Sequence, residues 1–315
     1  MATMTDQGIL YHDGTTVTSS VTATRAIFGF GYTGSVVSQS TTNLLNNYGI
    51  LATDTTSIGT PRWALAAAGY GGDKAIFGYG TGGGSTYSLT TLVSNLGVVT
   101  ANVTGVGTER WRLAAAGYGG DKAIFGYGYG VGGGSVQSMT NLVSNTGAVI
   151  GETSGVGTAR QALAAASYGG DKAIFGYGTN GNFGTQVSTT NRVSNTGVVI
   201  DNISSAGPGR MFLAAASYGG DRAIFGFGQI SGTRNSICNL VSNTGIVESQ
   251  FTSIGTARAG LSAAGYGGDK AAFGFGDTPT ATNIFNLVSN TGVVISDTSG
   301  IGTARRETAA ASYGS

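Results

Sequence analysis

The chain is poor in charge and proline, and it contains no long hydrophobic run. Only 10% of its 315 residues are charged, and the formal net charge is +1. Because a nucleic-acid binder needs a basic surface to displace the counterions of the phosphates, this composition argues against nucleic acid as a partner. No stretch approaches the roughly 18 apolar residues of a membrane-spanning helix, so we expect no membrane insertion.

Cysteine and histidine occur once each. With Cys238 as the single cysteine, no internal disulfide can form. His12, the single histidine, precedes the repeats described below, so a Ser-His-Asp triad or a His-rich copper site cannot be built from them. The acids that depart from the repeat are scattered among different units: Glu109, Glu152, Glu248 and Asp277. We therefore expect no enzyme, no metal and no cofactor.

Glycine and short apolar clusters are what the chain has in excess. It contains 57 glycines but only 3 prolines, without a Gly-X-Y period, and 40% of its residues are hydrophobic. This excludes collagen and a flexible linker, and it leaves enough apolar residues for a sizeable core. The N-terminal segment "MATMTDQGILYHDGTT" has no apolar run, so we expect no signal peptide.

Three sequence markers each recur six times, at intervals of 47 to 50 residues. The first is an arginine after a Gly-rich turn, and we call these six the ring arginines: Arg62, Arg110, Arg160, Arg210, Arg258 and Arg305. The second is the Phe of "AIFG" or "AAFG": Phe28, Phe77, Phe125, Phe175, Phe225 and Phe273. The third is the Asn that ends "LVSN" and its variants: Asn47, Asn95, Asn145, Asn195, Asn243 and Asn290.

The spacing between markers separates packed segments from loops. The distance from Asn to Arg and from Arg to Phe is always 15 residues, whereas that from Phe to Asn varies between 17 and 20. Fixed lengths indicate segments that pack in register, and variable lengths indicate a surface loop. All length variation therefore lies in one loop per unit, after residues 31, 80, 128, 178, 228 and 276.

Each unit predicts four short strands, typified by "LAAAGY", "KAIFGY", "TNLVS" and "VVISD". The turns "GGD" and "NTG" supply the positive φ that tight hairpins need. Gly interrupts every apolar run, so no helical stripe persists. Four strands in a period of about 40–50 residues are typical of β-propeller blades.

The two ends of the chain complement each other. The first unit begins at its second strand (residues 25–31), and the chain ends after a lone first strand (residues 308–315). If these two segments pair, six complete blades close into a ring and no sheet edge is left open, whereas a solenoid would carry atypical capping repeats. We predict an all-β, six-bladed β-propeller with four antiparallel strands per blade at residues 25–315, preceded by an arm at residues 1–24.

The repeat "TAR…LAAASYGGDKAIFGYG…TNLVSNTGVV" resembles the kelch type over residues 25–315. It departs from that pattern in its split glycines ("GYG") and in Val-Val where a Trp is usual. The chromosome-condensation-regulator propellers have a similar period. The near-identical "YGGDKAIFGYG" units also resemble predicted bacteriophage proteins, and this resemblance implies a location in the virion, as a fibre, appendage or decoration protein.

Two rings of charge are expected at opposite mouths of the central channel. The ring arginines begin the innermost strands, and we expect them to crown one mouth. Because a single ligand does not require six copies, binding of carbonyls in adjacent blades is favoured over an anion site. The Asp-Lys and Asp-Arg pairs in the first hairpins, such as Asp121-Lys122, are expected as solvated turns at the other mouth.

The variable loops offer the best candidate for binding. They are expected on the same face as the ring arginines, and their aromatic and arginine side chains resemble a paratope: Tyr32, Tyr87, Tyr129, Phe183 and Arg234. The predicted function is a non-enzymatic structural or recognition module of a phage virion. Its partners would be other virion proteins, a host-surface receptor or a glycan. The alternative is a carbohydrate-binding, lectin-like propeller.

Overall fold

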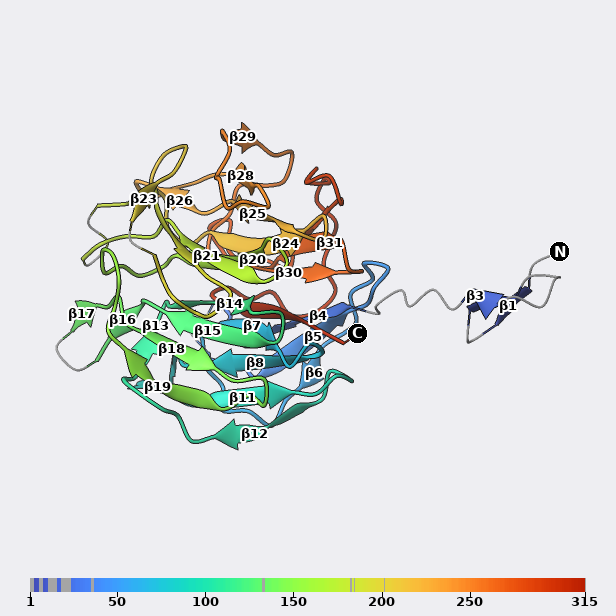
Figure 1. Cartoon of the computed structure of the whole chain (residues 1–315), viewed down its shortest axis with the longest axis horizontal. Helices are drawn as coiled ribbons and strands as arrows, with labels where there is room; N and C mark the ends of the chain where they lie inside the picture. Colours follow the sequence, from blue (N-terminus) through green and yellow to red (C-terminus); the bar gives the residue numbers. More distant parts are fainter. Residues whose placement is uncertain are drawn as a thin grey trace.

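The computed structural model describes residues 24–314, except 35–36, 132–133, 182, 184 and 201 (Figure 1). Before residue 24, it describes the backbones of three short strands that pair in an antiparallel sheet: β1 (Thr3–Thr5), β2 (Gly8–Leu10) and β3 (Thr16–Val17). His12 lies outside the described residues. Within the described part, no helix long and apolar enough to cross a membrane is found.

Six antiparallel sheets surround a central axis and form the blades. From the axis outward, blade 1 consists of β33 (Ala309–Tyr313), β4 (Arg25–Gly29), β5 (Thr41–Leu45) and β6 (Thr55–Thr56). Blade 2 consists of β7 (Ala66–Tyr70), β8 (Lys74–Gly78), β11 (Thr90–Val93) and β12 (Val99–Val103). Blade 3 consists of β14 (Ala114–Tyr118), β15 (Lys122–Gly126), β18 (Thr140–Val143) and β19 (Val149–Thr153).

The remaining three blades repeat this order. Blade 4 consists of β20 (Ala164–Tyr168), β21 (Lys172–Gly176), β22 (Thr189–Val193) and β23 (Ile203–Ser204). Blade 5 consists of β24 (Ala214–Tyr218), β25 (Arg222–Gly226), β28 (Ile237–Val241) and β29 (Phe251–Thr252). Blade 6 consists of β30 (Ser262–Tyr266), β31 (Lys270–Gly274) and β32 (Phe285–Val288), and its fourth strand is reduced to two bridges, Phe285–Thr298 and Val288–Val294.

The ring closes through pairing of the two chain ends, as predicted from the sequence. β33 pairs with β4 in the register Ala309–Gly29 to Tyr313–Arg25, which matches the β7–β8 hairpin from Ala66–Gly78 to Tyr70–Lys74. The innermost strand of each blade also contacts those of both neighbours, and β33 lies between β30 and β7. The predicted six-bladed propeller and its closure are therefore confirmed.

Two closed circles of backbone hydrogen bonds hold the innermost parts of the blades together. At one mouth, each N–H donates to the carbonyl of the equivalent residue in the preceding blade, over 2.7 to 3.0 Å, at Ala64, Arg112, Ala162, Phe212, Gly260 and Glu307. At the other mouth, the donors are Gly71, Gly119, Gly169, Gly219, Gly267 and Gly314. Their acceptors are the carbonyls of five turn aspartates and, for Gly267, of Thr24. Both circles run through all six blades, so each is complete only when the ring is closed.

The Phe-Gly pair of the "AIFG" strand explains how neighbouring blades pack. The Phe of one blade covers the Gly of the preceding blade: a Cβ placed on Gly126 would lie 2.9 Å from Cζ of Phe175, and one on Gly176 would lie 2.7 Å from Cζ of Phe225. Both Phe side chains are fully buried. Glycine is therefore required here by the close approach of a ring rather than by a turn.

We predict that Gly126→Ala lowers the free energy of unfolding by about 1–3 kcal/mol, because the added methyl group overfills a packed seam between blades. Gly151→Ala is the matched control. Gly151 also lies in a strand of blade 3 and has no positive φ, but a Cβ there meets nothing within 4 Å. Urea denaturation of both variants measures the difference. Equal midpoints would contradict the packing described here.

Candidate functional site: the mouth formed by the variable loops

Each variable loop folds back toward the channel and pairs with the residue that follows a ring arginine. The pairs are Tyr32–Arg306, Thr81–Trp63, Tyr129–Trp111, Thr179–Gln161, Gln229–Met211 and Asp277–Ala259. Three loops contain hairpin strands of their own: β9 (Thr81–Gly82) with β10 (Ser85–Thr86), β16 (Tyr129–Gly130) with β17 (Ser135–Val136), and β26 (Gln229–Ile230) with β27 (Thr233–Arg234). β16 also pairs with β13 (Arg110–Trp111).

The variable loops thus form one end of the molecule, which we call the loop mouth. In Figure 1 the labels β13, β16, β17 and β26 lie at the left, whereas the C-terminus and the start of β4 lie at the right. The hairpin turns with the Asp-Lys pairs form the opposite end, the turn mouth, which includes Thr24. The first residue of the described propeller therefore lies on the face away from the variable loops.

The ring arginines do not crown the loop mouth, contrary to the prediction. All six are 0% exposed, and each guanidinium lies over an aromatic ring of the preceding blade, with its carbon 4.2 to 4.9 Å from the ring centroid. These rings belong to the first aromatic residue after "AIFG" or its variant, for example Tyr127 under Arg160 and Phe275 under Arg305. The arginines are therefore buried between blades, where solvent anions cannot reach them.

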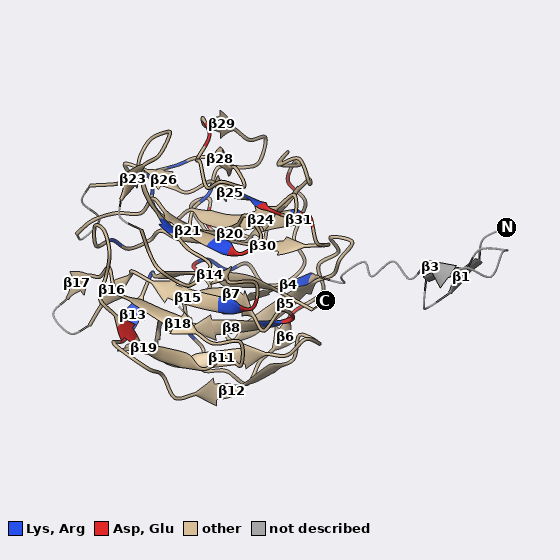
Figure 2. Ribbon diagram, in the orientation of Figure 1, with Lys and Arg blue, Asp and Glu red and all other residues tan. Residues whose placement is uncertain are grey.

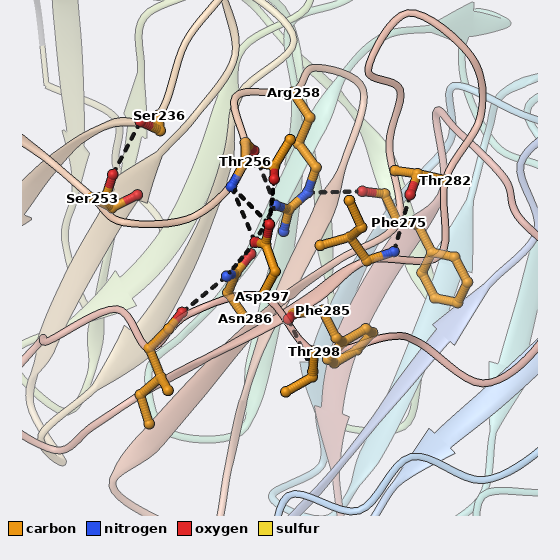
Figure 3. A network of polar contacts seen from close by, with 12 residues as sticks. Ser236, Ser253, Thr256, Arg258, Phe275, Thr282, Phe285, Asn286, Asp297 and Thr298 are labelled. Carbon is orange, nitrogen blue, oxygen red and sulfur yellow. Dashed lines mark hydrogen bonds and ion pairs between the residues drawn. The ribbon is translucent and has the colours of Figure 1, made fainter.

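The hydrogen bonds of the ring arginines are made mainly within their own blade. Figure 3 shows Arg258, whose Nε donates to the carbonyl of Phe275 at 3.1 Å and whose Nη1 donates to that of Thr256 at 3.2 Å. Asp297 accepts hydrogen bonds from Thr256 N–H at 3.0 Å and from Asn286 Nδ2 at 2.8 Å. The adjacent blade thus supplies an aromatic face, whereas the prediction had assigned carbonyls to it.

The same contacts span the seam between the two chain ends. Arg305 donates through Nη2 to Asn43 Oδ1 at 2.6 Å and through Nη1 to Asp54 Oδ1 at 3.4 Å, and its guanidinium lies over Phe275. Burial lowers the pKa of Arg258 to about 10, so its guanidinium stays protonated near neutral pH. The hydrogen bonds and the aromatic contacts of the ring arginines therefore indicate a structural role rather than a role in ligand binding.

In the segment that follows each ring arginine at the loop mouth, the six-fold repeat breaks down in side-chain identity but not in length. Two residues follow each ring arginine: Trp63-Ala64, Trp111-Arg112, Gln161-Ala162, Met211-Phe212, Ala259-Gly260 and Arg306-Glu307. The second residue of each pair has φ between 47° and 61°, so five non-glycine residues adopt the left-handed conformation around the axis. Backbone strain of this kind persists where the surrounding structure fixes it and tends to gather at functional sites.

One side of the loop mouth is aromatic. Ring centroids follow one another from Tyr32 to Trp63 at 4.9 Å, from Trp63 to Trp111 at 5.2 Å and from Trp111 to Tyr129 at 6.0 Å. The two tryptophans and Tyr129 are half-buried. These four rings, the aromatic row, present a partly exposed apolar surface that is fixed by neighbouring rings.

A second aromatic pair adjoins the axis. Phe183 and Phe212 stack with their centroids 5.9 Å apart, and Phe183 is 41% exposed. The guanidinium of Arg112 lies 4.8 and 4.9 Å from these two rings and 4.1 Å from that of Trp111. Arg112 thus joins this pair to the aromatic row.

The other side of the loop mouth is charged. Arg112 forms an ion pair with Glu307 at 3.3 Å, in which the side chains are only 13% and 10% exposed. Burial raises the pKa of Glu307, and the positive charge of Arg112 opposes this shift. Asp277 binds two arginines through one oxygen, Oδ2: Arg306 at 3.0 Å, and Arg234.

Besides a hollow of about 60 Å³ lined in part by Arg112, Phe212 and Glu307, two larger hollows lie in this region of the loop mouth. The smaller, of about 150 Å³, is lined by Phe212, Gln229, Arg234, Ala259, Gly260, Asp277, Arg306 and Glu307, and we call it the arginine pocket. The larger, of about 590 Å³, is lined by Phe183, Thr185, Gln186, Gly209, Met211, Gln229, Ile230, Ser231 and Gly232, and we call it the adjoining groove. Gln229 lines both.

The structure brings together four of the five residues predicted from the loops. Tyr32 and Tyr129 end the aromatic row, Phe183 stacks on Phe212, and Arg234 lines the arginine pocket. Tyr87 does not belong to the aromatic row, and its hydroxyl donates to the carbonyl of Gly82 within its own loop, as that of Tyr129 does to Gly134.

Sequence reasoning missed Trp63, Trp111, Arg112, Phe212 and Glu307. Its criterion was variable length, whereas these residues vary in identity inside a segment of constant length. A comparison of the two letters after each ring arginine would have shown this variation. Asp277 was noted among the non-repeat acids but was not placed beside Arg306.

The turn mouth retains the repeat. Its cavity, of about 200 Å³, is lined mainly by Gly, Ser and Tyr residues, together with Lys74 and Lys122. Lys122 pairs with Asp121 at 2.9 Å, and both side chains are well exposed, as expected of a solvated turn. Figure 2 shows how sparsely charged residues occur over the blades.

Among the described residues, no group of three or more His, Cys, Asp and Glu side chains could hold a metal ion. Cys238 is buried, and burial raises the pKa of its thiol to about 11. Comparison with known proteins finds no family model that matches the chain and no significant match among curated proteins.

Proposed function

We propose that the chain is a non-enzymatic recognition module that binds its partner at the loop mouth. The observation that supports this is the contrast between the two ends of one scaffold. The turn mouth repeats nearly the same residues in every blade, whereas the loop mouth presents different side chains at equivalent, rigidly held backbone positions. Binding sites are commonly built from varied loops on a rigid frame.

The chemistry of the loop mouth favours a glycan as the ligand. The faces of sugar rings carry C–H groups that pack against aromatic rings, and their hydroxyls pair with carboxylates and guanidinium groups. Half-buried rings, Asp277, Glu307 and three arginines adjoin one another here. This observation supports the lectin-like function as the ligand class of the recognition module.

A kelch-like classification and a place in a phage virion remain predictions that rest on the resemblance of the repeats. A virion protein that recognises a glycan on the host surface would combine both functions. Mass spectrometry of purified virions tests the location. Detection of the chain at a fixed copy number per particle would support it, and detection only in the soluble fraction of the lysate would contradict it.

The binding face is tested with two variant sets on an array of immobilised glycans. We predict that Trp111→Ser with Tyr129→Ser weakens binding by about 2 kcal/mol or more, roughly 30-fold, because both rings belong to the aromatic row. Asp121→Ser with Lys122→Ser, at the turn mouth, is the control and should leave binding unchanged. Melting temperatures are matched first. Loss of binding only in the control set would contradict the proposal, because it would place the binding site at the turn mouth.

A further inference from the structure

We propose that the arginine pocket binds the carboxylate of an acidic sugar, of the uronic or sialic acid kind, at the end of a glycan whose next residues lie in the adjoining groove. This inference rests on the proposed recognition of a partner at the loop mouth. It goes further, because it names the charge of the ligand and the group that is read.

The pocket is assembled at the junction of three blades. Arg234 belongs to the variable loop of blade 5, Asp277 to that of blade 6, and Arg306 to the segment that leads into the innermost strand of blade 1. Both arginines donate to Oδ2 of Asp277, and their side chains are 28% and 29% exposed. Because each position differs from its counterpart in the other blades, the pocket occurs once on the six-fold ring.

The charged side chains that line the pocket balance, and a surplus positive charge lies behind them. The lining contains Arg234, Arg306, Asp277 and Glu307. Arg112 does not line the pocket, but its ion pair with Glu307 brings the whole group to one positive charge. The raised pKa of Glu307 adds to this surplus whenever the carboxyl binds a proton. An anionic ligand is therefore favoured over a neutral or cationic one.

The arginines also retain unused donors. Nε of Arg234 and Nε of Arg306 have no hydrogen-bond partner, and although these two atoms are covered, the rest of each side chain is partly open, with exposed fractions of 28% and 29%. A guanidinium presents its donors as a planar fork that fits a carboxylate through two parallel hydrogen bonds. The guanidinium of Arg306 is also held in place by Tyr32, whose ring centroid lies 4.7 Å away. A planar carboxylate thus matches the donors better than a hydroxyl does.

The size of the two hollows indicates how a ligand would be divided between them. The arginine pocket, at about 150 Å³, is smaller than the sites of roughly 300–1,000 Å³ that enclose a drug-sized ligand, so it fits one terminal group. The adjoining groove, at about 590 Å³, has no ionisable side chain among its described lining residues, which include Met211, Phe183 and polar groups. Since Gln229 lines both, a glycan can place its acidic end in the pocket and its neutral part in the groove.

The experiment measures binding of matched small saccharides to the full chain by titration calorimetry. The probes are the methyl glycosides of glucuronic acid and of N-acetylneuraminic acid, the methyl esters of both, and methyl glucoside. At least one acid should bind tenfold or more tightly than its own ester, since esterification removes only the negative charge. The difference should shrink as salt rises.

Variants then assign the binding to the pocket. Arg306→Gln and Arg234→Gln should each weaken binding of the acid about tenfold or more and abolish its advantage over the ester, while Arg306→Lys should restore part of it. Arg192→Gln, on strand β22, is the matched control and should bind as the original chain does. If Arg306→Gln lowers the melting temperature, the assignment depends on Arg234→Gln. Arg234 lies on a surface loop, so we expect its replacement to leave the fold stable.

Two results would overturn the inference. One is equal affinity for acid and ester, and the other is no saturable binding of either acid up to about 10 mM, the limit of weak specific recognition. Either result leaves the proposed function standing if the loop-mouth variants still lose binding on the glycan array. If those variants bind like the original chain there, the proposed function fails as well.

Discussion

Removal of residues 308–315 should cost the chain about 5 kcal/mol or more of its free energy of unfolding, which is comparable with the whole stability of many domains. The segment contains β33, whose Ala309, Ala311 and Tyr313 are buried against blades 1 and 2. Its loss removes that apolar burial, at about 25 cal/mol per Å², and opens the circle of backbone hydrogen bonds at the turn mouth, to which Gly314 belongs, while Glu307 of the other circle becomes the chain end. It also exposes the edge of β4, so we expect aggregation on heating.

A circular permutant separates the loss of the strand from the loss of its connection. Joining residue 315 to Thr24 gives a link as long as the Gly-Gly-Asp turns of the other blades, and new ends can be opened at the exposed Gly83-Gly84. The permutant should melt at or above the temperature of the original chain, as followed by circular dichroism. A truncated chain that melts like the full one would refute the energetic importance of closure.

The fold could be predicted because constant spacing records packing. The invariant 15-residue interval from Arg to Phe contains the innermost strand and its hairpin with the second strand, which contact neighbouring blades, and a change of length there would break the register. The closure followed from one missing and one surplus strand. The reduced fourth strand of blade 6 could not be foreseen, because residues 293–297 carry a normal strand sequence, and only two bridges form in the structure.

The arginines were misplaced for a physical reason. A charged side chain at the start of an innermost strand is expected in solvent, since burial of an unpaired charge is costly. Here carbonyls, an Asn or Thr side chain and an aromatic face together replace water around the guanidinium, and the position of that face depends on the neighbouring blade. The sequence contains both partners but does not show their distance.

Only part of the candidate site could be predicted, because the sequence does not show which distant residues meet. Loop aromatics such as Tyr129 could be selected because their segment varies in length, whereas Arg112 and Glu307 lie 195 residues apart and meet only across the axis. What the structure adds is their neighbourhood. The ring is built by repetition, and the candidate binding side chains lie where repetition stops, in the loops of variable length and in the two residues that follow each ring arginine.

Replacement of a ring arginine should separate stability from binding. We predict that Arg160→Ala lowers the free energy of unfolding by about 2–5 kcal/mol, because it leaves a cavity over Tyr127. It also leaves two acceptors, Asn191 Oδ1 and the carbonyl of Thr158, without the hydrogen bonds that Arg160 donates to them. The free energy of unfolding of Arg160→Lys should lie between those of the original chain and Arg160→Ala. Lysine keeps the charge but lacks the planar guanidinium, which stacks on the ring and donates hydrogen bonds at the same time. Chemical denaturation of the three chains gives the order.

The same variants should retain ligand binding at temperatures where they are folded, because Arg160 is buried and takes no part in the loop mouth. Lys122→Gln serves as the surface control and should change neither stability nor binding, since its ion pair with Asp121 is exposed. Titration of each variant with the ligand identified on the glycan array makes the comparison. If Arg160→Lys abolished binding while its denaturation midpoint stayed unchanged, the ring arginines would belong to the binding site, and the recognition surface would have to extend between the blades.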